Sequence, residues 1–251
     1  MDLRISDLQK MQTELQDSHP HWGGVHPERG RHQLLWGICE IGEVIDIIKK
    51  RGEDEIMTNP ETRRHFIEEI ADVMMYFTDV MLCFGITAAE YSKTHARKHA
   101  HNMKRDWNEE IAHMFEKREY HSPDAQPEAA APDLRFSDLI AMQTELQTKY
   151  LDKWGGTPPS AGRNQLLWGI GEIGEVIDII KKRGEDEIMT NPETRRHFVE
   201  EIADVIMYLT DVMLCFGITA DEYSEIHARK HARNMKRDWD TEIAHMFDGK
   251  E

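Results

Sequence analysis

The sequence contains one long segment twice. Residues 33–115 align with residues 165–247 without a gap, and 73 of the 83 paired positions are identical. Upstream, LRISDLQKMQTELQ is similar to LRFSDLIAMQTELQ, while the stretches that follow these two blocks diverge as surface loops do. Self-similarity at a fixed offset predicts two copies of one structural unit. We therefore expect a first repeat over residues 1–117, a Pro- and Ala-rich linker over 118–133 and a second repeat over 134–251.

Each repeat is expected to be all-α, because apolar residues recur at spacings of three and four and no alternating strand pattern competes. In the first repeat, we predict helices over residues 5–17, 32–51, 60–84 and 88–116. The second of these has an expected apolar seam at Leu34, Ile38, Ile41, Ile45 and Ile48, and the third at Ile67, Ile70, Met74, Phe77 and Met81. Such spacings favour a four-helix bundle in which the third and fourth helices are antiparallel neighbours across a short loop.

Charge and composition argue against some classes of binding partner. The chain has 47 acidic residues against 31 Lys plus Arg, a formal charge of −16, which argues against nucleic acid and anionic membranes. The longest apolar run, residues 70–86, contains two aspartates, so a membrane span is not expected. Three cysteines make no disulfide framework, and we expect a cytoplasmic protein.

Acidic residues lie beside the apolar seams. Glu40 and Glu43 are three residues apart and share one helix face, and Glu69 and Asp72 repeat that spacing on the next helix. A buried carboxylate must pair, take up a proton or bind a metal. Four carboxylates on one seam repel one another unless cations occupy it, and all-oxygen ligation suits Mg²⁺ or Mn²⁺ better than zinc. The second repeat carries the same acids at Glu172, Glu175, Glu201 and Asp204.

Two alternatives exist for these acids. They could be solvated or form structural ion pairs with nearby basic residues, namely Lys49, Lys50, Arg63 or Arg64. A di-iron bundle also uses acids on four helices, but it needs E-x-x-H pairs, and neither acid motif here ends in His. Paired acids on adjacent helices favour the metal site over both alternatives.

The last helix of each repeat carries a basic stripe. Lys98, Asn102 and Arg105 fall on one face, and these side chains suit phosphate oxygens, although a solvated helix face is the alternative. The second repeat has the same pattern at Lys230, Asn234 and Arg237. His95 and His99 have the spacing of a zinc pair, but no third ligand is evident nearby.

The chain has no P-loop, no G-x-S-x-G turn and no C-x-x-C pair. The order E-x-x-E, E-x-x-D and K-x-x-x-N-x-x-R resembles the all-α nucleoside triphosphate pyrophosphohydrolases, a superfamily that includes the MazG proteins and the dimeric dUTPases. The resemblance covers essentially both repeats. It implies Mg²⁺-dependent hydrolysis of a (d)NTP between the α- and β-phosphates, which releases the monophosphate and pyrophosphate and serves nucleotide-pool housekeeping.

The resemblance also implies roles for individual residues. The paired acids would hold Mg²⁺, and Glu43 and Glu175 would accept the proton of the attacking water. Gln12-Thr-Glu-Leu-Gln16 is similar to the Gln-x-x-Leu-Asn segment with which dimeric dUTPases contact the base, although Gln16 stands where they have Asn. The second repeat has Gln143 and Gln147 at these positions. In the first repeat, Trp22 and Trp36 either line a base pocket or belong to the core.

Members of this superfamily work as dimers or tetramers whose bundles combine helices of two protomers. We therefore expect the two repeats to pack as an intrachain pseudo-dimer, with further homodimerisation left open. One alternative function is a dUTPase or another pyrimidine-specific dNTP pyrophosphatase. Another, from a different class, is a non-catalytic helical module that senses nucleotides or scaffolds a partner.

Overall fold

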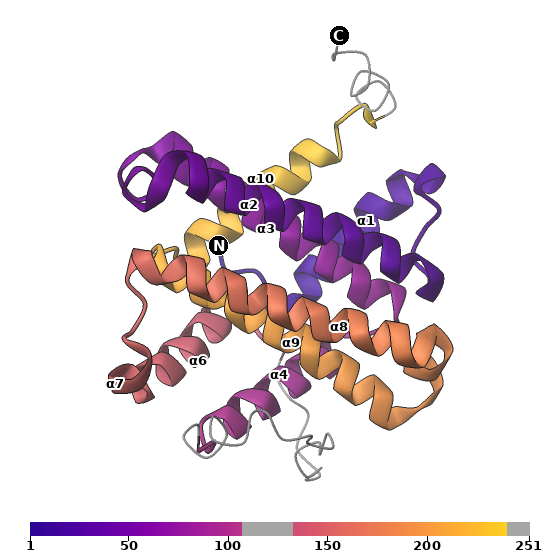
Figure 1. The fold of residues 1–251 in the computed structure, drawn as a ribbon. Helices are drawn as coiled ribbons and strands as arrows, with labels where there is room; N and C mark the ends of the chain where they lie inside the picture. The colour runs from indigo at the N-terminus through magenta and orange to yellow at the C-terminus, as the bar shows by residue number, and fades with distance from the viewer. Residues whose placement is uncertain (107–132, 240–251) are drawn as a thin grey trace.

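The computed structural model describes residues 1–106 and 133–239, and all of their regular elements are helical (Figure 1). Within these ranges the chain has no β-strand, and one isolated antiparallel bridge joins Arg4 to Arg135. The all-α fold class is thus confirmed. Most of the expected linker, residues 118–132, lies outside the described residues, as does the predicted helix beyond residue 106.

The first half contains α1 (Ile5–Ser18), η1 (Pro20–Trp22), η2 (Pro27–Arg29), α2 (Gly30–Thr58), α3 (Pro60–Cys83) and α4 (Ala88–Asn102). The second half contains α6 (Phe136–Lys149), α7 (Leu151–Trp154), η3 (Pro159–Ala161), α8 (Gly162–Thr190), α9 (Pro192–Cys215) and α10 (Ala220–Asn234). Two predicted ends are wrong. The last helix of the first half ends at Asn102 rather than at 116, and α2 continues past residue 51 after a break at Gly52, whose φ of 77° suits glycine.

Local signals in the sequence set the start of α3. The Oδ1 atom of Asn59 accepts hydrogen bonds from the backbone N–H groups of Glu61 and Thr62 at 2.9 and 3.2 Å. Pro60 occupies the first helical position, where its missing N–H costs nothing. Glu61 places a negative charge in the first turn, where the helix dipole favours it. The predicted cap is confirmed.

The helices form two long hairpins, α2 with α3 and α8 with α9 (Figure 1). The expectation that α4 runs antiparallel to α3 is wrong, because the chain bends by 112° between them, after Gly85 with its φ of 59°. Helix α4 instead packs against α9, and α10 packs against α3. No single helix in residues 1–106 and 133–239 is long and apolar enough to cross a membrane, and only the bent pairs α3–α4 and α9–α10 pass that test together.

The buried apolar side chains of both halves form one core cluster. All five predicted seam residues of α3 are buried, which confirms that seam. On α2 the prediction is partly wrong, because Ile38 and Ile45 are 36% and 39% exposed. The buried positions of α2 instead follow the stripe Leu34, Gly37, Ile41, Val44 and Ile48, which keeps the three- and four-residue spacing on a slightly rotated face.

Reciprocal contacts join the two halves. The guanidinium of Arg63 donates two hydrogen bonds to the Glu222 carboxylate and one each to the carbonyl oxygens of Phe216 and Gly217. Arg195 makes the same set of contacts in the other direction, to Glu90 and the carbonyl oxygens of Phe84 and Gly85. Arg63 and Arg195 therefore make equivalent contacts in opposite directions.

Candidate metal and anion site

Three of the four predicted acids of each set come together. In the first half, Glu40 of α2 meets Glu69 and Asp72 of α3, with ligand oxygens that all lie within 4.8 Å of one another. In the second half, the same arrangement is formed by Glu172, Glu201 and Asp204. The two α3 acids share a face because they are three residues apart, and the hairpin brings α2 to that face. We call these the first and second acid clusters.

The fourth acid of each set, Glu43 or Glu175, is exposed and lies outside its cluster. At 3.6 residues per turn, a residue three positions along a helix is rotated by about 60° from the first. Glu40 faces the α3 acids, and this rotation turns Glu43 toward solvent. The proposed roles of Glu43 and Glu175 as ligand and base stay predictions.

Each acid cluster receives its lysine from the opposite half of the chain. The ammonium of Lys98, on α4, lies 2.5 Å from Asp204 Oδ2 and 4.0 Å from Glu201 Oε1. Reciprocally, Lys230 of α10 forms an ion pair with Asp72 and lies 3.8 Å from Glu69. The bend after α3 causes this exchange, because it carries each basic helix away from the acids of its own half.

One ammonium does not neutralise three carboxylates. Burial, and then the charges of Asp72 and Glu69, raise the pKa of Glu40 to about 7. In the second cluster, burial together with Asp204 and Glu201 raises the pKa of Glu172 to about 8. The excess negative charge favours either a bound proton or a second cation. Because all the donors are carboxylate oxygens, the set fits Mg²⁺ or Mn²⁺, as the sequence predicts.

Three of the four basic residues offered as structural partners for these acids pair with other acids. Lys50 pairs with Asp46, Arg63 with Glu222 and Arg64 with Glu68. Among the flanking histidines, the Nε2 atom of His65 lies 3.0 Å from Glu69 Oε1. These three basic residues therefore pair with acids outside the clusters, and the clusters are neutralised only in part.

A cavity of about 400 Å³ adjoins the second acid cluster. Its volume lies within the range of small-molecule sites, about 300–1,000 Å³. The predicted residues that line it come from both halves and are Asn102, Arg105, Gln143, Gln147, Glu172 and Asp204. The lining also includes Trp154 and Trp168, the second-half counterparts of Trp22 and Trp36. The sequence did not single out Asn164, Tyr208 and Asp211, which complete the polar lining.

Glutamines and an aspartate form a buried group in each half. The Nε2 atoms of Gln12 and Gln16 both donate to Asp79 Oδ2, at 3.0 Å. In the second half, Gln143 Nε2 donates to the carbonyl oxygen of Met207 at 3.3 Å, and Gln147 and Gln143 lie close enough to Asp211 to lower its pKa through hydrogen bonding. Burial outweighs these hydrogen bonds and raises the pKa of both aspartates to about 7. The polar character of Asp79 inside an apolar helix was the available sequence signal, and it is the same signal that singles out Asp72.

The loops near the two clusters differ, as their sequences do. Tyr150 donates to the carbonyl oxygens of Asn102 and Arg105, at 3.1 and 3.0 Å, and so anchors the end of α4 beside the cavity. In the first half, Trp22 stacks on His19 with ring centroids 4.3 Å apart and meets Trp239 edge-on. Neither Trp22 nor Trp36 belongs to the buried core, and Trp36 is 42% exposed.

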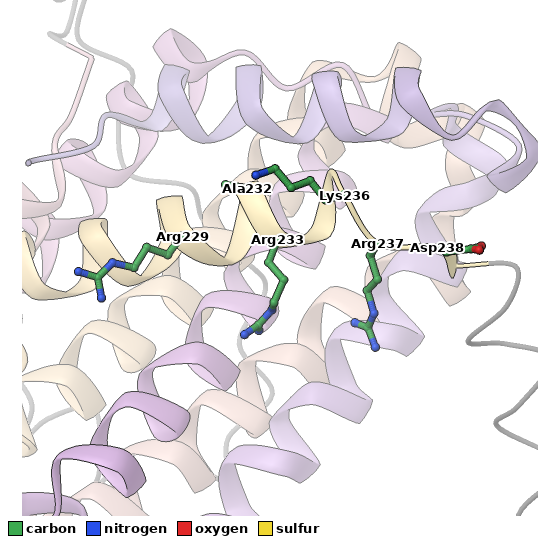
Figure 2. A pocket seen from close by; sticks show the side chains of 6 residues that line it. All are labelled: Arg229, Ala232, Arg233, Lys236, Arg237 and Asp238. Atoms are coloured by element: carbon green, nitrogen blue, oxygen red, sulfur yellow. The ribbon is translucent and has the colours of Figure 1, made fainter.

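A second, open depression runs along the solvent side of α10 and is lined by Arg229, Ala232, Arg233, Lys236, Arg237 and Asp238 (Figure 2). Figure 2 shows Arg229 and Arg233 extending from one side of α10, Arg237 extending the same way from the segment after it, and Lys236 on the other side. Arg229 pairs with Glu225, and Arg233 lies 3.3 Å from Glu68. Because these charges diverge and the depression is open, it is the weaker candidate for an anion site.

The histidines with zinc-pair spacing have structural partners. The Tyr91 hydroxyl lies 2.9 Å from His95 Nδ1, and the Nε2 atom of His99 lies 2.9 Å from the carbonyl oxygen of Met142. Burial lowers the pKa of His95 to about 3, so this ring is neutral. The two rings are therefore engaged in packing α4 and do not converge on a shared ligand position.

No family model matches the chain, and comparison with curated proteins and with solved structures gives no significant match. The fold and the site alone define the class of protein. It is an all-helical protein with two acid clusters that could hold divalent cations, each facing a lysine from the other half.

Proposed function

We propose that this chain is a Mg²⁺- or Mn²⁺-dependent nucleoside triphosphate pyrophosphohydrolase of the all-α superfamily that its motifs resemble. It would convert a (d)NTP to the monophosphate and pyrophosphate as part of nucleotide-pool housekeeping. One observation carries the proposal: a partly neutralised three-carboxylate cluster faces a buried lysine beside a cavity lined by amide, guanidinium and indole groups. Such a set can bind a cation and an anion at the same place.

The roles divide by charge. Glu172, Glu201 and Asp204 would hold the cation, which when bound neutralises phosphate oxygens and favours ionisation of a bound water. Arg105 and Lys98 would bind the phosphate oxygens from the opposite half of the chain. The exposed Glu175 next to the cluster is the proposed acceptor of the water's proton, and Asn102 would orient the substrate by hydrogen bonding.

We further propose that the halves are tandem MazG-like repeats packed as an intrachain pseudo-dimer. The exchanged lysines, the reciprocal Arg63 and Arg195 contacts and the shared core support this arrangement. Each active site would then be composite, with acids from one repeat and the basic helix from the other. A single chain would carry two such sites.

The test is pyrophosphate release from a full panel of NTPs and dNTPs in the presence of Mg²⁺ or Mn²⁺. We expect release from at least one nucleotide, and loss of it when Glu43→Gln and Glu175→Gln are combined. If no nucleotide of the panel releases pyrophosphate, the catalytic proposal is wrong. Nucleotide binding by calorimetry without turnover would favour the non-catalytic module, and turnover of dUTP alone would favour the dUTPase.

A further inference from the structure

The glutamine–aspartate groups contain buried atoms with no hydrogen-bond partner. In the second half these atoms are Gln143 Oε1, Gln147 Oε1 and Asp211 Oδ1, and in the first half they are Gln12 Oε1, Gln16 Oε1 and Asp79 Oδ1. All six are acceptors. Buried polar atoms are ordinarily paired, so a group of unpaired acceptors points to a partner that brings donors. We call each set of three residues an acceptor group.

The aspartate fixes which way the glutamines face. An ionised carboxylate only accepts hydrogen bonds, so Gln12 and Gln16 must turn their Nε2 atoms toward Asp79, as observed. Reversing either amide would place its oxygen against a carboxylate oxygen. The two glutamines are four residues apart and share one helix face, so both Oε1 atoms are presented together with Asp79 Oδ1.

The acceptor group of the second half lines the 400 Å³ cavity, together with Trp168 and Tyr208. Asp211 is only 3% exposed, so its free oxygen is directed away from bulk solvent. Asp204, at the acid cluster, is seven residues away on the same helix, which is two turns or about 10 Å. The cavity is therefore lined both by carboxylates of the second acid cluster and by the acceptor group.

We propose that the acceptor groups select a nucleobase that carries an exocyclic amino group over uracil and thymine, an inference that rests on the proposed function. An amino nitrogen brings two N–H donors from a single atom and satisfies two acceptors at once. Uracil and thymine bring one imide N–H flanked by carbonyl oxygens, which would face further acceptors. A site built to accept hydrogen bonds rejects an analogue that lacks the donors.

The test compares dCTP with dUTP, which differ at position 4 of the base. We measure kcat/KM for pyrophosphate release, and binding of the non-hydrolysable α,β-imido analogues by calorimetry with Mn²⁺. The pH is about 8.5, above the pKa of about 7 that burial gives Asp211. We expect dCTP to exceed dUTP by at least about tenfold in both measurements.

The combined variant Asp79→Asn and Asp211→Asn introduces an amide donor beside the base. It should raise the dUTP-to-dCTP ratio by about tenfold, whereas Glu14→Gln, on the exposed side of α1, should leave the ratio unchanged. Wild-type protein that favours dUTP, or treats the pair equally, overturns the base selection while the proposed function stands. If neither nucleotide is hydrolysed, the binding ratio decides, and failure of both analogues to bind overturns the two proposals together.

Discussion

The Lys98 ammonium lies 2.5 Å from a carboxylate oxygen of Asp204, a residue of the opposite half of the chain. The reciprocal pair joins Lys230 to Asp72. Both lysines are largely buried, at 14% and 7% side-chain exposure, so each pair is shielded from the solvent that weakens surface ion pairs. Each acid cluster therefore has an ion-pair partner from the other half.

The first prediction follows from this exchange. Lys98→Met should remove most of the turnover of the second acid cluster, by about 100-fold at that site, because it deletes a buried cation facing the phosphates. When Lys98→Met is combined with Asp204→Asn, turnover should fall no further, because the second acid cluster is already inactive. Added to Asp72→Asn, Lys98→Met should abolish the activity that remains. Steady-state pyrophosphate release by the single and double variants measures this.

The matched control for that series is Lys93→Glu. The second half already has Glu225 at the corresponding position, so the change is compatible with the fold. It should leave turnover unchanged. If Lys98→Met were instead additive with Asp204→Asn and redundant with Asp72→Asn, the crossed pairing of helices and clusters would be wrong.

The second prediction concerns pH. Burial raises the pKa values of Glu40 and Asp79 to about 7 and that of Glu172 to about 8. The folded chain thus binds more protons than the unfolded chain at neutral pH, so the free energy of unfolding should fall as pH rises from 6.5 to 8. Buried His95 has the opposite effect below pH 6.5. Because its pKa is lowered to about 3, the unfolded chain binds the extra proton there, and the free energy of unfolding rises with pH.

Urea denaturation in EDTA at several pH values within that window measures the effect. Asp79→Asn combined with Asp211→Asn should flatten the decline, because it removes two of the raised groups. Mg²⁺ should stabilise the protein most at the alkaline end, where it replaces the protons. A stability that rises with pH between 6.5 and 8 would contradict the buried-acid account.

The third prediction concerns the join between the halves. Arg63 contacts Glu222 and two backbone carbonyls, and its side chain is 20% exposed. Arg63→Ala should lower the free energy of unfolding by about 1–3 kcal/mol, because it leaves these partners partly buried without a donor. Chemical denaturation of Arg63→Ala, Glu222→Gln and the double variant should show coupling between them. Additive losses would mean that the two side chains do not interact.

The fourth prediction uses two glycines of α2. A Cβ atom on Gly30 would overlap the ring of Phe84, while one on Gly42 would meet nothing within 4 Å. Gly30→Ala should therefore destabilise the fold by about 1–3 kcal/mol through overpacking. Gly42→Ala should be neutral or stabilise it by up to about 1 kcal/mol, since alanine favours the helix. Melting temperatures of the two variants in parallel decide whether α2 packs this closely.

Local signals in the sequence were sufficient for much of the fold. The Asn59-Pro60-Glu61 cap and the α3 seam follow from the spacing of residues along one helix, and both are present. The acids of α3 share a face for the same reason, and the adjacent hairpin partner supplies Glu40.

The remaining features depend on packing between helices. The chain bends by 112° after Gly85, and α4 packs against α9. The spacing of apolar residues within α4 does not reveal this partner. The exposure of Ile38 and Ile45 reflects a small rotation of α2 about its axis. Asp79 could be noticed in the sequence, but its pairing with Gln12 and Gln16 requires the contact between α1 and α3.

We propose that the two crossed clusters of acids and lysines hydrolyse a nucleoside triphosphate. The most direct measurement is pyrophosphate release from the dNTP panel with Mg²⁺, for the wild-type chain and for a variant that combines Asp72→Asn with Asp204→Asn. We expect monophosphate and pyrophosphate from the wild type and neither product from the folded variant. Equal release by the two proteins, or none from the wild type, would contradict it.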